Sequence, residues 1–440
     1  MKNPNTHFED HCDLHISAFP EGMEADIETR GAKNAALPMI MYSFILDECD
    51  VTIENVPNIA DVQSTLELLE AMGGQFTFNR EKGDLHITHG ITCNRIPDDL
   101  VHKTRISVLL MSVLLAKYGT VLFPTEVGGC NLGARKFDYH LEAFRSLGCS
   151  VSETGRHISV VRKDKNPIQP LVTFPQPTTT GTANAMFLAA HCGSTTKIEN
   201  AHLRTEILEL ISFLNQCGNN IAIEGDTIVI HGAEARRTKN IIKTVRDDVE
   251  EALTYIALGY LTDSKLKVKF SNPYNFGEVN FLKEIAADTF HRENYHLTQS
   301  PISEEQRHDM VTMETGPYPK IGSDSQPILS ALLLQMARKF RVIDNRFTDR
   351  FSYLDHFRAY NISVTKVGNR IDVVSPEDRR NGSEVHELEA QNLRCAINAL
   401  LTASYFQQPV VIRNAHFMQR GYTDIFERMN TLGFKTSILT

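Results

Sequence analysis

Short strand-like runs that end in an asparagine or a proline recur along the chain at nearly even distances. The six runs end at positions 55, 124, 200, 272, 345 and 414. Successive ends lie 69, 76, 72, 73 and 69 residues apart. Further strands with alternating apolar residues follow in the copies, as in residues 85–88 and 228–231. Since a fixed period is the signature of a repeated structural unit, the sequence predicts six copies of one module.

Two kinds of helix are predicted in each module. Ahead of each run lies a helical segment that is apolar nearly throughout, as in residues 105–110 and 326–333, which indicates a buried helix. After the run comes a helix with apolar residues at three-to-four spacing, such as Val62, Leu66 and Leu69, which indicates one buried face. Most of these second helices are expected to stop at a glycine or an asparagine, the residues favoured at helix C-caps. The predicted stops are Gly73, Gly148, Gly218, Asn361 and Gly433.

Six modules divide most simply into three plus three. A charged segment, residues 243–248, lies between the third and fourth modules, and the amino terminus supplies strand-like residues that can complete the second half. We expect a first three-repeat domain at residues 34–245 and a second formed by residues 1–33 plus 246–440. Small-molecule sites are commonly found where domains meet, so an active site is expected in the cleft between the two domains.

Composition excludes several classes of protein. The chain has 440 residues, of which 42% are hydrophobic and 22% charged, as in ordinary globular proteins. Its net charge of −9 argues against binding to nucleic acid or to a membrane surface. The longest apolar runs, near residues 35–46 and 106–116, are shorter than the ~20 residues of a membrane-spanning helix. Eight cysteines without a CxxC pair indicate free thiols in a reducing compartment, so a cytoplasmic location is expected.

The amino-terminal segment is rich in histidine. His7, His11 and His15 are four residues apart beside Cys12, so a helix would carry all three imidazoles on one face, where they could bind a metal. Nothing caps such a helix, and terminal segments fray. We therefore predict no metal site in this segment.

A glycine-rich loop joins the strand-like residues 121–123 to a helix expected at residues 139–147. It places Cys130 among three glycines, with Arg135 just before the helix. Glycine backbone can approach a ligand closely, and an arginine near a helix start adds a planar cation to a place that favours anions. The loop therefore suits an anion site with a candidate acid or nucleophile, although an ordinary turn with a bystander cysteine fits the same local pattern.

Three motifs spread along the chain, together with the sixfold repeat, resemble the enolpyruvyl transferases. The motifs are Gly31-Ala32-Lys33-Asn34-Ala35-Ala36-Leu37-Pro38, then Gly128-Gly129-Cys130 with Gly133-Ala134-Arg135, and Arg420-Gly421-Tyr422. The strongest resemblance is to the branch that transfers enolpyruvate from phosphoenolpyruvate to UDP-N-acetylglucosamine, the first committed step of peptidoglycan synthesis. It implies an α/β fold of two domains, each an inside-out α/β barrel of three βαβαββ units.

The resemblance also implies an addition-elimination reaction that releases phosphate, with no cofactor. Cys130 matches the proposed proton donor, Asp324 the aspartate that takes the acceptor's proton, and Lys33 a catalytic cation. The positions matching cations for phosphoenolpyruvate are Lys33, Arg135, Arg394 and Arg420. The positions matching acceptor contacts are Asn34, Arg105, Asp138, Thr179, Thr180, Gly181, Asp324, Asn345 and Arg346. An asparagine after a strand is also a common turn residue, which leaves a structural role open for Asn345.

The departures from this branch concern mainly the acceptor. Val127 and the pair Lys136-Phe137 replace residues on the uridine side of the loop, Pro177 stands where a lysine is expected, and Asn392 replaces an aspartate. A paralogue with another nucleotide or sugar acceptor therefore stays open. A catalytically silent ligand-binding relative also stays open. Such a relative should have lost at least one residue among Lys33, Cys130, Asp324 and Arg420, and all four are present. An RNA phosphate cyclase would need a nucleophilic histidine near its carboxyl end and a more basic surface, and neither stands out in this sequence. The shikimate-phosphate branch is disfavoured by the cysteine loop. A monomer or weak homo-oligomer is expected.

Overall fold

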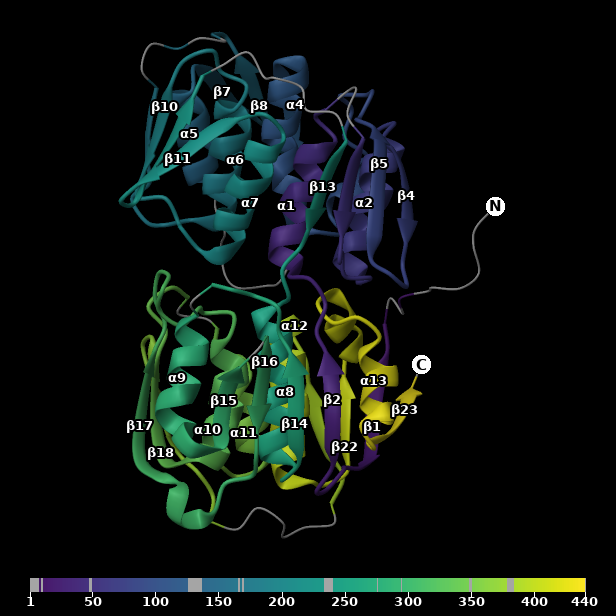
Figure 1. Ribbon diagram of the computed structural model, residues 1–440, viewed down its shortest axis with the longest axis vertical. Coiled ribbons are helices and arrows are strands. Elements are labelled where there is room, and N and C mark those ends of the chain that lie inside the picture. Colours follow the sequence, from purple (N-terminus) through teal and green to yellow (C-terminus); the bar gives the residue numbers. More distant parts are fainter. Residues whose placement is uncertain are drawn as a thin grey trace. The chain divides into compact units, whose positions relative to one another are not determined.

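Figure 1 shows the computed structural model of the chain. The structure describes residues 8, 11–46, 50–125, 137–164, 167, 170–232, 240–274, 276–293, 295–347, 350–377 and 384–439. The chain divides into two compact units. The described parts of residues 1–30 and 247–440 form unit 1, and the described part of residues 31–246 forms unit 2. The main chain therefore passes from one unit to the other after Arg30 and again after Arg246.

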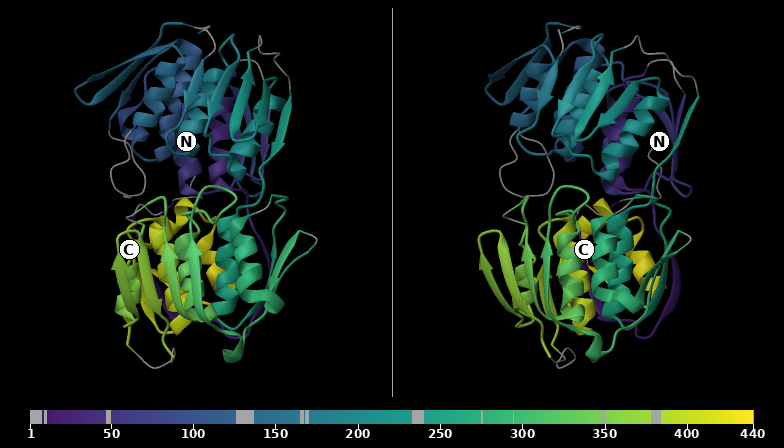
Figure 2. Two further views of the ribbon diagram at one scale, coloured as in Figure 1. Left: turned by 90° about the vertical axis from the view of Figure 1, so that its left-hand side faces the viewer. Right: turned by 60° about the vertical axis from the view of Figure 1, so that its left-hand side comes forward.

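Unit 1 contains three four-stranded sheets, each mixing parallel and antiparallel pairs. The first has the order β21 (His386–Glu389), β22 (Val410–Arg413), β1 (Asp13–Ala18), β23 (Lys435–Leu439). The second has the order β15 (Phe290–Glu293), β16 (His296–Gln299), β14 (Lys265–Lys269), β2 (Glu24–Glu28). The third has the order β17 (His308–Glu314), β18 (Ala337–Ile343), β20 (Arg370–Val374), β19 (Ser363–Val367). Figure 2 shows these sheets from two further directions.

The helices of unit 1 are of the two predicted kinds. Every residue of α8 (Val249–Leu261), α10 (Gln326–Met336) and α12 (Leu393–Phe406) is buried, and these three helices contact one another. A helix that is apolar all round is stable only when it is covered on every side, here by its neighbours and the sheets. The outer helices α9 (Gly277–Ala286), α11 (Leu354–Ala359) and α13 (Ile425–Thr431) each bury one face. Short 3-10 turns complete the unit: η2 (Ala287–Thr289), η3 (Glu304–Gln306) and η4 (Ala415–Arg420).

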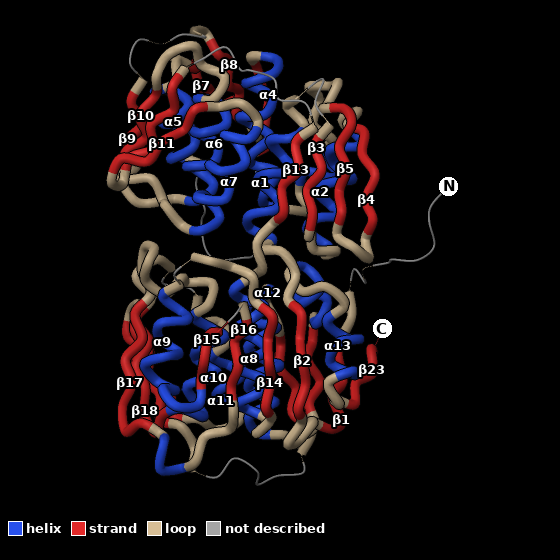
Figure 3. Tube along the Cα trace, viewed as in Figure 1, coloured by secondary structure: helices blue, strands red, loops and turns tan. Residues whose placement is uncertain are grey.

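Unit 2 repeats this arrangement with its own buried core. Its sheets have the orders β13 (Ile241–Thr244), β3 (Val51–Glu54), β5 (Asp84–His89), β4 (Gln75–Asn79); β6 (Thr120–Pro124), β8 (His157–Arg162), β7 (Cys149–Thr154); and β11 (Asn220–Glu224), β12 (Thr227–His231), β10 (Thr196–Glu199), β9 (Leu171–Thr173). Its helices are α1 (Lys33–Ser43), α2 (Ala60–Ala71), α3 (Asp98–Val101), η1 (Arg105–Leu109), α4 (Leu110–Tyr118), α5 (Asp138–Ser146), α6 (Thr179–Ala189) and α7 (Thr205–Gln216). Figure 3 distinguishes strands from helices in both units.

The recurring asparagine of the sequence repeat ties neighbouring strands together. Asn55, Asn200 and Asn345 each follow a strand, and the side-chain nitrogen of each donates a hydrogen bond to a backbone carbonyl just beyond the adjacent parallel strand. The acceptors are the carbonyls of Val245, Phe174 and Thr315, at 3.0, 2.7 and 3.0 Å. An amide side chain can satisfy a carbonyl that has no further ladder partner at the end of a sheet. At these three positions the recurring asparagine therefore ties the end of one strand to the chain that follows its parallel neighbour.

The predicted ends of the second helices are confirmed. Gly73, Gly148, Gly218, Asn361 and Gly433 all have a positive φ, between 56° and 95°. This left-handed conformation closes a helix at little cost for glycine and is tolerated by asparagine.

Two local expectations differ from the structure. Residues 105–109 form the 3-10 turn η1 before α4 begins at Leu110, so the apolar segment is helical in two pieces. The histidine-rich segment is not a helix over its described part, because His15 lies within strand β1, where alternation buries Leu14 and Ile16. His7 lies outside the described residues, and no group of His, Cys, Asp and Glu able to hold a metal occurs within the described ranges. None of the described helices is long and apolar enough to cross a membrane.

Candidate active site

Lys33 is the first residue of α1, and a carboxylate in unit 2 fixes its ammonium group. Lys33 Nζ lies 3.1 Å from Asp61 Oδ2, and the two side chains are only 15% and 9% exposed. Asp61 stands in the first turn of α2, where a carboxylate also interacts favourably with the helix dipole. Gly31 precedes the helix at a point where an added Cβ would lie 2.0 Å from the Asn55 carbonyl oxygen. Lys33 is thus a positioned cation, and half-buried Asn34 follows it on the helix.

The start of α5 is fixed by aromatic and imidazole packing. The guanidinium of Arg105 lies 5.7 Å from the centre of the Phe137 ring, next to Asp138, which is exposed at the first position of the helix. His140 is buried, and its Nδ1 lies 2.8 Å from the amide nitrogen of Asn184. Burial, with a smaller effect of Arg105, lowers the pKa of His140 to about 3. His140 is therefore neutral at physiological pH and accepts the amide proton at Nδ1.

The start of α6 carries three of the predicted acceptor residues. Thr178 caps the helix, its Oγ1 accepting a hydrogen bond from Gly181 N at 3.4 Å, and Thr179 Oγ1 lies 2.9 Å from His202 Nδ1. An added Cβ on Gly181 would lie 2.4 Å from Thr178 Cγ2. Thr180 is half-buried. Backbone amides at a helix start favour an anion, so this turn can hold a phosphate group.

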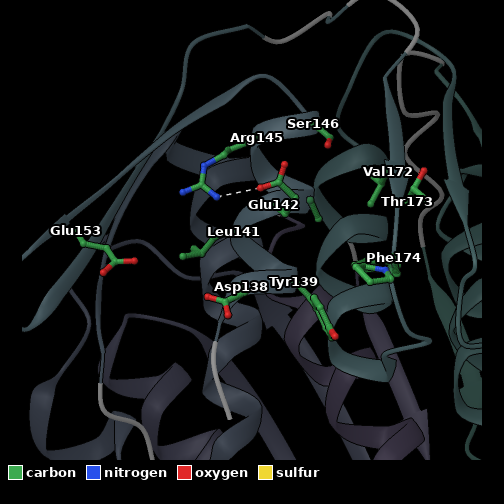
Figure 4. A pocket seen from close by; sticks show the side chains of 12 residues that line it. Asp138, Tyr139, Leu141, Glu142, Arg145, Ser146, Glu153, Val172, Thr173 and Phe174 are labelled. Carbon is green, nitrogen blue, oxygen red and sulfur yellow. Dashed lines mark hydrogen bonds and ion pairs between the residues drawn. The ribbon is translucent and has the colours of Figure 1, made fainter. Parts of the chain in front are cut away.

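A pocket of about 400 Å³ lies within unit 2 between α5 and the segment after β9. Figure 4 shows Asp138 and Tyr139 on one side and Phe174 on the other, with Glu142 paired to Arg145 at 3.1 Å. Its size falls in the range of small-ligand sites, and its lining combines aromatic surface with a few polar groups. Asp138 therefore borders a cavity that can accept a planar polar ring.

Asp324 and Arg394 are two predicted residues that unit 1 brings together. Asp324 precedes α10, and its side chain is 33% exposed. Arg394 Nη2 lies 3.4 Å from Asp324 Oδ2, and Arg350 Nη1 lies 2.5 Å from Asp324 Oδ1. The guanidinium groups of Arg394 and Arg350 thus both bind this carboxylate, and the sequence motifs indicated Arg394.

Arg394 is fixed at the start of buried helix α12. The side-chain oxygen of Asn392 caps this helix and accepts from the backbone nitrogens of Arg394 and Cys395, at 3.1 and 3.0 Å. The capping role expected of an aspartate is therefore retained by asparagine. Burial alone would lower the pKa of Arg394, but the charges of Asp324 and Glu250 raise it overall, so the guanidinium stays charged.

The remaining predicted residues differ in how far the structure places them. Asn345 uses its amide nitrogen for the strand-end bond described above and is exposed beside Arg346, whose guanidinium lies 5.4 Å from the centre of the Phe347 ring. Arg420 is half-buried at the last position of η4. Cys130 and Arg135 lie outside the described residues.

A protein-family model described as EPSP synthase (3-phosphoshikimate 1-carboxyvinyltransferase) matches residues 19–429. The chain belongs to this family. Among curated relatives in the EPSP synthase family, the UDP-N-acetylglucosamine 1-carboxyvinyltransferase of Deinococcus deserti is 30% identical over 427 residues, which cover 96% of this chain and 96% of that protein. The protein of the same name from Sulfurimonas denitrificans is 29% identical over 431 residues, covering 97% and 99%.

Solved structures share the fold. The enolpyruvyl transferase NikO from Streptomyces tendae superposes with a TM-score of 0.83 at 18% identity, covering 98% of this chain and 99% of that one. An EPSP synthase from Acinetobacter baumannii has a TM-score of 0.73 at 15% identity, covering 98% and 100%. The predicted enolpyruvyl transferase resemblance and the predicted α/β fold class are both confirmed.

Two charged residues of the described site were missed by reasoning from the sequence. The sequence indicated Asp61 only weakly. It is an acidic residue in the first turn of the amphipathic helix that follows the Lys33 helix along the chain. Arg350 carried none, because it belongs to no motif and reaches Asp324 only through the fold.

Proposed function

We propose that this protein transfers the enolpyruvyl group of phosphoenolpyruvate to a hydroxyl of UDP-N-acetylglucosamine and releases phosphate. The observation that carries the proposal is the match to relatives named UDP-N-acetylglucosamine 1-carboxyvinyltransferase over nearly the whole chain. The product would be the first committed intermediate of peptidoglycan synthesis, and we propose a cytoplasmic location. Lys33 lies in unit 2 and Asp324 in unit 1.

In the proposed addition step, the acceptor hydroxyl oxygen forms a bond to C2 of phosphoenolpyruvate. The hydroxyl proton passes to Asp324, and C3 receives a proton from Cys130. In the elimination step, C3 returns a proton to the Cys130 thiolate and the bond from C2 to the phosphate oxygen breaks, which restores the double bond. The proton held by Asp324 then passes to the departing phosphate. The phosphate and carboxylate of phosphoenolpyruvate need fixed cations. We assign that role to Lys33, Arg135, Arg394 and Arg420.

On the acceptor side, we propose that the start of α6 binds the nucleotide phosphates. We assign Thr179, Thr180 and Gly181 to this role. The backbone amides of Thr179 and Thr180 would bind the phosphates, while the amide of Gly181 donates to Thr178 Oγ1 and keeps the turn compact. The uracil ring would enter the pocket bordered by Asp138. The remaining proposed acceptor contacts are Asn34, Arg105, Asp324, Asn345 and Arg346.

A second candidate function is transfer to a different nucleotide or sugar acceptor. The observation that favours it is the changed phosphate and uridine side of the site. Pro177 stands two residues before Thr179 where a lysine is expected, so one cation for a diphosphate is missing from that position. Phe137 is 9% exposed and packs edge to face with Phe123, 5.9 Å between ring centres, so its ring faces the core.

Phosphate release from phosphoenolpyruvate tests both candidates. The purified protein would be assayed with UDP-N-acetylglucosamine, UDP-glucose, UMP and shikimate 3-phosphate as acceptors. Release with UDP-N-acetylglucosamine at the highest kcat/KM supports the main proposal, and preference for another acceptor supports the paralogue. Asp324→Asn is the matched control, since it removes the base with little change in shape and should abolish release with every acceptor. No release with any acceptor would contradict the assignment of enolpyruvyl transfer.

A further inference from the structure

A cysteine and a histidine lie in contact within the core of unit 1. Cys395 Sγ, in the first turn of α12, lies 3.5 Å from Nε2 of His356 on α11, and the two residues are 2% and 1% exposed. We propose that protonated His356 holds Cys395 as a thiolate and that this thiolate is a site of reversible oxidation by peroxides. The inference goes beyond the proposed transfer reaction, which does not use this pair.

An acceptor oxygen faces each nitrogen of the His356 ring. Nε2 lies 3.0 Å from the backbone carbonyl oxygen of Glu389, and Nδ1 lies 3.1 Å from Oδ1 of Asn398. A neutral imidazole has one N–H and one nitrogen with a lone pair, so it would set that lone pair against one of these oxygens. The imidazolium donates from both nitrogens. The contacts therefore assign His356 as protonated.

The orientation of the Asn398 amide is fixed by its other contacts. Its Nδ2 donates to the backbone carbonyl oxygen of Pro327 at 2.9 Å, and its Oδ1 accepts from the hydroxyl of Thr402 at 3.3 Å. Exchanging the two amide atoms would bring two buried acceptor oxygens together at Pro327 with no proton between them, which is costly. Oδ1 therefore faces His356, and His356 supplies the proton of that hydrogen bond.

The buried imidazolium requires an anion beside it. An unpaired buried charge is strongly unfavourable, and the ionisable group in contact with the His356 ring among the described residues is the Cys395 thiol. The first turn of a helix also favours a thiolate. Burial alone would raise the pKa of Cys395, but His356, the backbone nitrogen of Gln391 and the Ser352 hydroxyl lower it overall. Burial alone would lower the pKa of His356, but Cys395 and its hydrogen bonds raise it.

Hydrogen peroxide can oxidise a thiolate in this position. Gln391 is exposed and Ser352 half-buried, so a small movement of either side chain opens a path for a molecule nearly as small as water. The sulfur attacks one peroxide oxygen, the S–O bond forms and the O–O bond breaks. The sulfur is oxidised by two electrons to a sulfenic acid, and the departing hydroxide takes a proton from His356 and leaves as water. Thiol reductants reverse this oxidation.

The test compares two equally buried cysteines of the wild-type protein. Cys192 is also 2% exposed, but its thiol donates to the Leu188 carbonyl oxygen at 3.5 Å, and burial raises its pKa against the opposing effect of Arg162. The full chain would be treated with hydrogen peroxide at neutral pH together with dimedone, which traps sulfenic acids, and the adducts mapped by mass spectrometry. We expect Cys395 to be labelled at least about 10-fold faster than Cys192.

Substitutions test the role of the imidazolium. His356→Gln keeps a hydrogen-bond donor without the charge, so labelling of Cys395 should fall to about the rate for Cys192. His386→Gln is the matched control and should leave labelling unchanged, since His386 is a half-buried histidine of the same unit whose Nε2 lies 2.8 Å from Gln408 Oε1.

The labelling rates decide the inference without any measurement of activity, so its failure would be distinct from failure of the proposed function. Equal labelling of Cys395 and Cys192 in the wild-type protein, or no label on either, would overturn it. Wild-type labelling of Cys395 in His356→Gln would overturn the role of the imidazolium. If His356→Gln does not fold, as judged by circular dichroism, the comparison within the wild-type protein decides.

Discussion

Replacing Glu209 by glutamine is expected to stabilise the protein at neutral and alkaline pH and to leave its stability unchanged in acid. Glu209 lies on α7 and is 2% exposed. Its Oε2 accepts a hydrogen bond from the backbone nitrogen of Arg246 at 3.2 Å, at the residue where the chain leaves unit 2. Burial raises the pKa of Glu209 from 4.5 to about 7, against the opposing effects of the Arg246 amide and the Lys243 charge.

The size of the effect follows from this shift. A group whose pKa is raised by folding favours the folded state while it is protonated, and that contribution is lost as the pH rises through the folded-state pKa. Between 4.5 and about 7 the penalty for ionised Glu209 grows to roughly 3 kcal/mol. Glutamine cannot ionise, and its carbonyl oxygen can still accept from Arg246 N. The variant should therefore equal wild type below pH 4.5 and exceed it by up to about 3 kcal/mol above about pH 8.

Urea unfolding across this pH range measures the difference. The chain contains no tryptophan, so far-ultraviolet circular dichroism is the suitable signal. Glu224→Gln on the exposed end of β11 is the matched control, since its carboxyl group is solvated and the substitution should change stability little at any pH. A constant stability difference between Glu209→Gln and wild type at all pH values would refute the reasoning, as would a variant less stable than wild type at pH 8.

Three further outcomes are expected. An epoxide phosphonate such as fosfomycin should alkylate Cys130 and inactivate the enzyme. Iodoacetamide should also modify Cys93, the exposed cysteine among those that the structure describes. Peptide mapping that finds both reagents on Cys93 alone would contradict the role of the loop thiol. Lys33→Met should raise the KM for phosphoenolpyruvate and lower kcat/KM more than 100-fold, while Asp61→Asn, which removes only the partner of the ammonium, should cost about 10-fold; equal losses would mean that Asp61 itself contacts substrate. Gly181→Ala should lower the free energy of unfolding by about 1 to 2 kcal/mol through loss of the helix cap, and wild-type stability in urea would show that the capping side chain moves aside freely.

The repeat and its helix ends could be predicted because they depend on local chemistry. Glycine at Gly73 or Gly148 and asparagine at Asn361 are selected by a positive φ that other residues avoid, so the residue type alone reports the conformation. The alternation of buried and half-buried helices likewise follows from side-chain pattern. The start of α4 was less predictable, since a 3-10 turn and an α-helix share almost the same apolar spacing over one turn.

The site was predictable only where a motif carried it. Lys33 and Arg394 stand in sequence patterns that mark a family, but their partners do not. Asp61 reaches Lys33 across 28 positions, and Arg350 reaches Asp324 across 26, through contacts that depend on how helices and strand ends pack. In a sequence, a charged residue outside any motif is most simply interpreted as a solvated surface group. The burial that gives Arg350 its meaning exists only in the folded chain.

The pairing of β1 has a consequence for how the protein is made. This strand, Asp13–Ala18, lies between β22 and β23, whose residues are synthesised about 400 positions later. The described strands of unit 2 all pair within residues 51–244. That unit can therefore complete its sheets before the partners of β1 have been synthesised. At a ribosomal rate of about 5 to 20 residues per second, the wait lasts roughly 20 to 80 s. For that time an apolar strand edge is exposed to chaperones and to its neighbours on the polysome, and the first sheet of unit 1 closes only when translation is nearly finished.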